Sequence, residues 1–323
     1  MWDFSSKNYS DFSIEPRINL NLGINKHHSL HAGYMYTKQY THLLLAAGTI
    51  MLNEVWVPAS NKTPASKVEQ YTAGFSSNYT GFQTQVDVFF KNMANLATYR
   101  EGYTAFEGDK NWQSKVESNG FGKAKGLELY IKKSTGKATG FAAYTLSKAT
   151  REYPNINLGR EFLFNYDRTH SFSIFANYKI RENVDLNFTW IYQTGLPYTP
   201  AIGKVYSPTV EGDETVYYEK LIYGEKNSQR MRNYHRLDVS INYTKTNKHN
   251  RNTIWGFSVY NLYNRQNPYY YYFNTNKSGE IIIPATGSEA LPLKLYQMSF
   301  FPVLPSVYYK VFFEKNDKVI NNR

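Results

Sequence analysis

Apolar and polar side chains alternate along most of this chain, in runs of about ten residues that recur between positions 16 and 313. In one run, Phe188 and Trp190 alternate with Asn187 and Thr189. Successive side chains of a β-strand point to opposite faces, so each run predicts a strand with one apolar and one polar face. A helix drawn through the same residues has no single apolar face.

The pattern predicts about twelve strands, a length and number that suit tilted strands crossing a membrane. The predicted strands are 14–24, 28–39, 67–79, 82–93, 119–133, 138–149, 169–181, 183–195, 234–246, 251–265, 294–302 and 305–313.

The connections between these strands are short and long in turn. The short ones are Asn25 to His27, Thr80 with Gly81, Ser134 to Lys137, Glu182 near Asn183, Asn247 to Asn250, and Val303 with Leu304. The long ones are 40–66, 94–118, 150–168, 196–233 and 266–293. Short turns at one end and long loops at the other are typical of outer-membrane barrels, so we predict an all-β fold, an antiparallel transmembrane β-barrel.

Composition agrees with a barrel and argues against a membrane helix bundle. The mean hydropathy is −0.57, aromatic residues make up 17% of the chain, and Gly48 and Thr49 interrupt the longest apolar stretch. The chain has no cysteine and therefore no thiolate metal site. The net charge is +11, but lysines and arginines are scattered, which disfavours nucleic-acid binding.

No enzymatic motif is present, and we expect neither a catalytic site nor a cofactor or metal site. The seven histidines show no metal-ligand spacing with acidic residues. Two pairs invite a catalytic interpretation, Asp167 with His170 and Arg236 with Asp238. The alternation favours a structural interpretation, in which Arg236 and Asp238 share the polar face of one strand.

The aromatic run from Tyr269 to Phe273, together with Tyr217 and Tyr218, has two interpretations. The rings could stack on a ligand, or they could lie at headgroup level as an interfacial girdle. The girdle is favoured for the five-residue run because it adjoins a predicted strand that ends near Arg265.

Several segments resemble the TonB-dependent receptors of Gram-negative outer membranes in their order and spacing. These segments are Trp56 to Pro58, Lys67 to Phe75, Phe89 to Leu96, Gly126 to Leu129, Ala143 to Ser147, Asp167 to His170, Gln193 to Tyr198, Tyr234 to Asp238 and Val259 to Asn264. The last strand, which ends at Phe313, resembles the family's C-terminal signature, except that a polar tail follows it.

The resemblance implies the C-terminal portion of a barrel of the 22-stranded type. Nothing resembles the plug, the TonB-contacting segment or a signal peptide, and we expect an N-terminal portion to be missing. The expected organisation is a lead-in over 1–13, the barrel portion over 14–313 and a polar tail over 314–323.

The expected function is energised uptake of a large, scarce nutrient such as a siderophore, vitamin or glycan, in a multi-pass barrel of the outer membrane. Expected partners are outer-membrane lipid, an extracellular small molecule or oligosaccharide, and the TonB complex through the missing N-terminal region. Ligand specificity is expected in the long loops. The alternatives are a passive porin or structural barrel and a soluble β protein, of which exposed apolar stripes disfavour the second.

Overall fold

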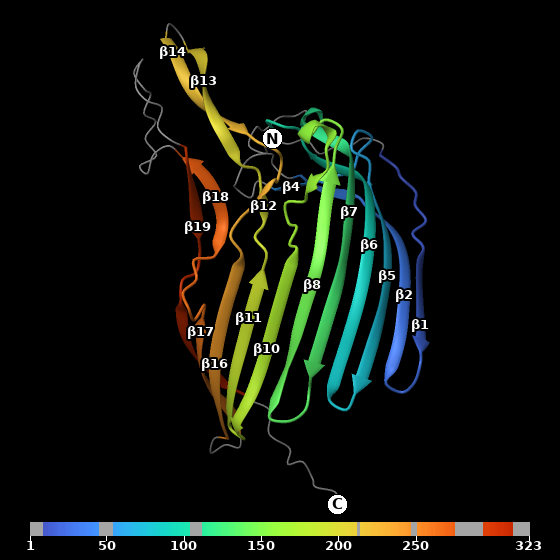
Figure 1. Cartoon of the computed structure of the whole chain (residues 1–323), viewed down its shortest axis with the longest axis vertical. Helices are drawn as coiled ribbons and strands as arrows, with labels where there is room; N and C mark the ends of the chain where they lie inside the picture. The colour runs from blue at the N-terminus through green and yellow to red at the C-terminus, as the bar shows by residue number, and fades with distance from the viewer. Residues whose placement is uncertain are drawn as a thin grey trace, which may run out of the picture.

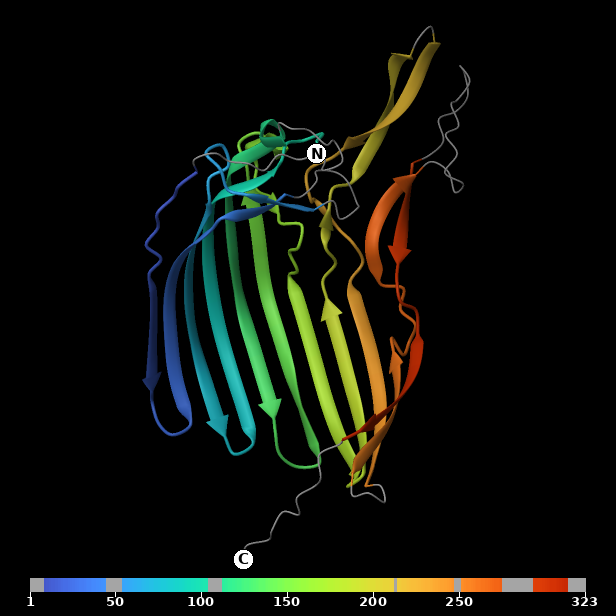
Figure 2. The same cartoon turned by 180° about the vertical axis from the view of Figure 1, so that it is seen from behind.

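A computed structural model describes residues 9–44, 54–103, 112–211, 214–246, 251–274 and 293–312. Eleven strands form one antiparallel sheet in the order β1-β2-β5-β6-β7-β8-β10-β11-β16-β17-β20, and the short strand β9 pairs with β8. The sheet is curved, with the tight turns at one end and the long connections at the other (Figures 1 and 2).

The strands of this sheet follow the alternating runs closely, except for the short β9, which lies within the predicted connection 150–168. They are β1 (Arg17–Gly23), β2 (His28–Gln39), β5 (Ser66–Tyr79), β6 (Phe82–Tyr99), β7 (Val116–Lys133), β8 (Ala138–Glu152), β9 (Phe162–Leu163), β10 (His170–Arg181), β11 (Val184–Gln193), β16 (Tyr234–Thr246), β17 (Asn252–Tyr260) and β20 (Leu304–Val311).

The long connections carry further paired strands, and of these the alternation predicted only β19, within the expected strand 294–302. The paired strands are β3 (Thr41–Leu44) with β4 (Val55–Pro58), β12 (Pro197–Tyr198) with β15 (Gln229–Arg230), β13 (Ala201–Glu211) with β14 (Glu214–Tyr223), and β18 (Pro268–Asn274) with β19 (Lys294–Ser299). Two 3-10 turns lie at Trp112–Lys115 and Asn157–Gly159. In the described part of the chain, no helix is long and apolar enough to cross a membrane.

The strand register gathers the apolar residues on one face of the sheet. Phe188 on β11 lies opposite Ala176 on β10 and Val239 on β16, and the next apolar positions continue this row. Many large apolar side chains of this face are exposed, among them Leu20 at 67% and Ile131 at 50%, and others are half-buried. An apolar face this extensive and this exposed is suited to lipid.

The opposite face is polar and its side chains bond across the strands. The Nε2 atom of His31 lies 2.5 Å from Oδ1 of Asp87, although a third strand runs between them. Gly74 on that strand allows the contact, since a Cβ atom there would lie 2.1 Å from the Asp87 oxygen. A cavity of about 440 Å³ lined by Asn187 and Ser240, among others, opens on this face.

The predicted strand 294–302 is wrong as a member of the barrel sheet. The strand that forms within this range, β19, pairs with β18, and β20 pairs directly with β17. The chain therefore does not reverse at Val303, where a tight turn was expected.

The pairing changes because the contacts of Asn261 form a joint between the β17–β20 pair and the β18–β19 pair. Its backbone φ is 54°, and its amide donates hydrogen bonds to the carbonyls of Arg265 (3.0 Å) and Phe301 (3.2 Å). The joint interrupts both arms of one long hairpin at the same level, which divides each arm into two strands. The predicted turn at 247–250 lies outside the described residues.

The buried apolar side chains lie at the long-loop end rather than within the sheet. One cluster contains Leu44, Val57, Tyr99 and Trp112, among others. A second cluster contains Tyr153, Ile156 and Phe162. The loops therefore pack on one another and on the extended ends of β6, β7 and β8, which continue beyond the predicted strand ends.

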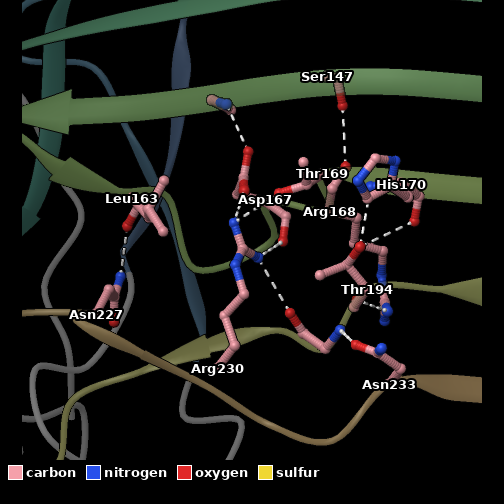
Figure 3. A network of polar contacts seen from close by, with 12 residues as sticks. Ser147, Leu163, Asp167, Arg168, Thr169, His170, Thr194, Asn227, Arg230 and Asn233 are labelled. Carbon is pink, nitrogen blue, oxygen red and sulfur yellow. Dashed lines mark hydrogen bonds and ion pairs between the residues drawn. The ribbon is translucent and has the colours of Figure 1, made fainter.

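A buried ion pair ties the segment after β11 to the segment before β10 (Figure 3). Arg230 on β15 binds Asp167, whose side chain has no exposed surface, and donates to the carbonyls of Asp167 and Gly195 at 3.1 Å. The other carboxylate oxygen of Asp167 accepts a hydrogen bond from the backbone N–H of Ala149. Because both charges have several partners, the burial of the pair is compensated.

We predict that Arg230→Met lowers the free energy of unfolding by about 3–5 kcal/mol, because it leaves the Asp167 carboxylate buried and unpaired. Urea unfolding in detergent, followed by tryptophan fluorescence, measures the change. The double variant Asp167→Asn with Arg230→Met is expected to lose less than the sum of the two single changes.

The matched control is Arg160→Met, since the ion pair of Arg160 with Glu225 is exposed at both partners. Exposed ion pairs contribute about 0–1 kcal/mol to the free energy of unfolding. Equal losses for Arg230→Met and Arg160→Met would show that burial of the Asp167 pair has no special weight.

Candidate ligand-binding site

A cavity of about 210 Å³ lies at the long-loop end of the sheet. Its walls come from β3, the ends of β6 and β8, and the connections on either side of β9. Arg151 lines it from β8, and Lys226 lines it from the segment between β14 and β15. Among the described residues that line this cavity, none is an aspartate or glutamate.

Both cations lie against aromatic rings. The guanidinium carbon of Arg151 is 4.2 Å from the ring centre of Phe164, and Nζ of Lys226 is 5.2 Å from that of Phe162. The ring of Tyr153 stacks on Phe162 with centroids 6.2 Å apart. The wall therefore presents positive charge beside flat apolar surface, a combination suited to an anionic ligand with rings.

Close backbone approach makes room for the Tyr153 ring. A Cβ atom on Gly120 would lie 2.1 Å from that ring, so only glycine fits at this position of β7. Tyr153 itself is buried, with 4% of its surface exposed. One wall of the cavity is thus fixed by the pairing of β7 with β8.

Two asparagines hold the segment that carries Lys226. Asn227 is buried and donates hydrogen bonds to the Leu163 carbonyl (2.7 Å) and to Oδ1 of Asn165 (2.8 Å), the first of which is drawn in Figure 3. The backbone N–H of Lys226 donates to Oδ1 of Asn157 at 3.0 Å. Because these contacts reach the connection between β8 and β10, they keep the Lys226 side chain close to Arg151.

Burial shifts the pKa values of three side chains that line the cavity. Burial lowers the pKa of Lys226 to about 8, against a smaller opposing effect of Glu101. Burial raises the pKa of Tyr153 to about 12. Burial also lowers the pKa of His42, whose Nε2–H donates to the Pro64 carbonyl at 3.0 Å.

The two residue pairs that invited a catalytic interpretation make contacts that hold the fold together. Asp167 binds Arg230, whereas the ring of His170 contacts the Tyr144 hydroxyl at 2.9 Å, and no direct contact joins Asp167 to His170 among the contacts of the described residues. Arg236 and Asp238 pair on the polar face of β16, with Nε and Oδ2 3.0 Å apart.

The aromatic run divides between two faces of the β18–β19 hairpin. Tyr271 is buried, lies edge-on to Tyr198, and accepts a hydrogen bond from the Arg232 backbone N–H at 3.0 Å. Tyr272 faces the other way and stacks on Tyr296. The side chains of Tyr217 and Tyr218 lie outside the described residues.

The histidines of the described residues do not gather into a metal site, although His31 pairs with Asp87. Within the described ranges, no group of three or more His, Asp or Glu side chains is arranged to hold a metal ion. Arg151, Phe162 and Lys226 were not singled out in the sequence, because they are distant along the chain and fall in predicted connections without a motif. The expectation that specificity lies in the long loops was the only sequence signal that pointed to them.

No protein-family model and no curated protein matches the chain. Several solved structures share its fold at low sequence identity. The ferric yersiniabactin uptake receptor FyuA of Yersinia pestis has 12% identity and a TM-score of 0.56, with 92% of this chain and 37% of that one covered. The ferric-catecholate import receptor Fiu of E. coli K12 has 14% identity and a TM-score of 0.54, with 92% and 34% covered.

The ferric citrate transporter FecA has 12% identity and a TM-score of 0.52, with 92% and 37% covered. All three are named as receptors or transporters. The chain spans about a third of the length of each. Its fold is that of the β-barrels of outer-membrane TonB-dependent receptors.

Proposed function

We propose that this chain is the barrel portion of a TonB-dependent receptor that crosses the outer membrane many times and takes up an anionic ligand. The cavity lined by Arg151 and Lys226 carries this proposal, because it offers two cations and no carboxylate at the loop end. Uptake would be energised by the TonB complex, acting through a plug and an N-terminal segment supplied outside the barrel strands.

Aromatic rings at both ends of the apolar face support the membrane placement. At the tight-turn end, Tyr243, Trp255 and Tyr309 lie opposite one another on three neighbouring strands. At the long-loop end, Tyr71 is exposed on this face, and the hydroxyl of Tyr192 accepts a hydrogen bond from the Asn233 amide. Amphipathic rings in these positions form the two interfacial girdles of a transmembrane barrel.

Iron complexes are the first ligands to test. The solved structures with this fold include receptors for ferric yersiniabactin and ferric catecholates and a transporter of ferric citrate. Citrate and catecholate complexes of ferric iron carry negative charge, and catecholates also present flat rings to Phe162 and Phe164. Vitamins and oligosaccharides remain in the wider substrate class, but uncharged sugars would make no use of the two cations.

A passive porin needs a closed wall, and the described strands do not provide one. Among the described residues, β1 pairs only with β2, and β20 pairs only with β17. Two unpaired edges in contact with lipid would leave backbone groups without partners. We therefore expect this chain alone to give no stable conductance steps in planar bilayers.

Binding of an anionic ligand is predicted to depend on both cations. Arg151→Met and Lys226→Met should each weaken the binding of ferric citrate or a ferric catecholate by about ten- to hundredfold, since a hydrogen bond to a charged group is lost. Lys62→Met is the matched control, because Lys62 is exposed and outside the cavity. Titration calorimetry measures the affinities, and equal affinities in all variants would refute the site.

The cavity lined by Arg151 and Lys226 also predicts that the affinity for the anionic ligand depends on pH. The anion favours protonated Lys226, whose pKa without ligand is about 8, so affinity should fall as the pH rises through 8. Lys226→Met should abolish this part of the dependence. A wild-type affinity that is constant between pH 7 and pH 9 would count against a role for Lys226.

The membrane placement gives a separate prediction. Phe188→Arg puts a charge near the middle of the apolar face and should destabilise the protein in lipid vesicles by about 2–4 kcal/mol. Thr189→Arg is the control, since Thr189 lines the cavity on the polar face. Urea titration in vesicles compares the two variants, and equal losses would contradict the assignment of the lipid face.

A further inference from the structure

The apolar face of the sheet changes character on β7 and β8 toward the long-loop end. On β7, Leu127, Leu129 and Ile131 occupy this face, and the next two positions on the same face are Lys123 and Lys125. On β8, Leu146 is followed on the same face by Lys148. A band of lysines therefore adjoins the apolar band on the same face of the sheet.

The register places these lysines against one another. Lys125 lies directly opposite Lys148, and Lys123 is the next residue of β7 on that face. All three side chains are exposed. Like charges directly opposite on neighbouring strands are destabilising unless an anion lies between them.

None of the described residues forms an ion pair or a side-chain hydrogen bond with the ammonium group of any of the three lysines. Glu152 shares this face of β8 and lies beyond Thr150, which is opposite Lys123, yet it forms no ion pair with Lys123. The charge is therefore open to a ligand from outside the chain.

The level of the lysines matches a lipid headgroup region. Lys125 is roughly 7 Å along the strand from Leu127, and the Lys125 row continues through Phe90 to Tyr71. The Tyr71 ring is 47% exposed on the same face, an amphipathic group of the kind found at membrane interfaces. Lysine side chains at such a level extend their ammonium groups toward phosphates.

We propose that Lys123, Lys125 and Lys148 form a docking site for the phosphate of a lipid headgroup in the leaflet at the long-loop end. The site rests on the proposed membrane placement and is separate from the cavity of Arg151 and Lys226. Lipid is the occupant because the lysines continue the apolar band on the same two strands. A lipid with its chains on Leu127 and Leu146 would bring its phosphate to the lysines.

The test uses the full chain extracted from membranes in mild detergent. Native mass spectrometry compares the binding of phosphatidic acid, which carries an exposed phosphate, with that of phosphatidylcholine. Wild type should prefer phosphatidic acid. The triple variant Lys123→Gln, Lys125→Gln, Lys148→Gln should lose about tenfold or more of that preference, since each lysine near a phosphate contributes about fivefold.

A matched triple variant on the polar face controls for net charge, namely Lys91→Gln, Lys132→Gln, Lys179→Gln. It should keep the preference, and an equal loss in both triple variants would overturn the site. Inorganic phosphate in excess should compete poorly if the headgroup is the ligand, and full competition would assign the site to free phosphate instead. Wild type that remains soluble without detergent would refute the membrane placement itself, whereas membrane-bound wild type without lipid preference would refute only the lysine site.

Discussion

The antiparallel ladder of backbone hydrogen bonds is the constraint on which the rest of this structure depends. In a hydrocarbon environment, each N–H and C=O group needs a partner within the protein, and a continuous ladder supplies them without water. The ladder also fixes which side chains share a face. A shift by one residue between β11 and β16 would put Phe188 and Val239 on opposite faces of the sheet, so the two-faced pattern depends on the register.

Ladder pairing also explains where the molecule has a conventional core. Among the described residues, neither face of the sheet is covered by another layer of the chain, and the buried clusters lie where the loops meet the strand ends. Leu44, Tyr99 and Trp112 pack together there, and the Asp167–Arg230 pair anchors that region to the strands. The cavity lined by Arg151 and Lys226 lies in this region of buried loop contacts.

The sequence predicted the regular part of the fold well because alternation is a local property. The runs around Leu127, Phe188 and Val239 became β7, β11 and β16 with the expected faces. It failed at 294–302, because no local pattern shows that Asn261 bonds to Phe301 forty residues away. The candidate site was out of reach for the same reason, since Lys226 approaches Arg151 only through asparagine contacts between separate loops.

The number of strands that run toward the tight-turn end differs from the number that run toward the long-loop end. This difference limits how the sheet can be completed into a closed barrel. Its eleven strands alternate in direction, so β1 and β20 both run toward the tight-turn end. Direct pairing of these two edges would be parallel, in contrast to every other pair in the sheet. An all-antiparallel closure therefore requires a complement with an odd number of strands, whose outer members both run toward the long-loop end.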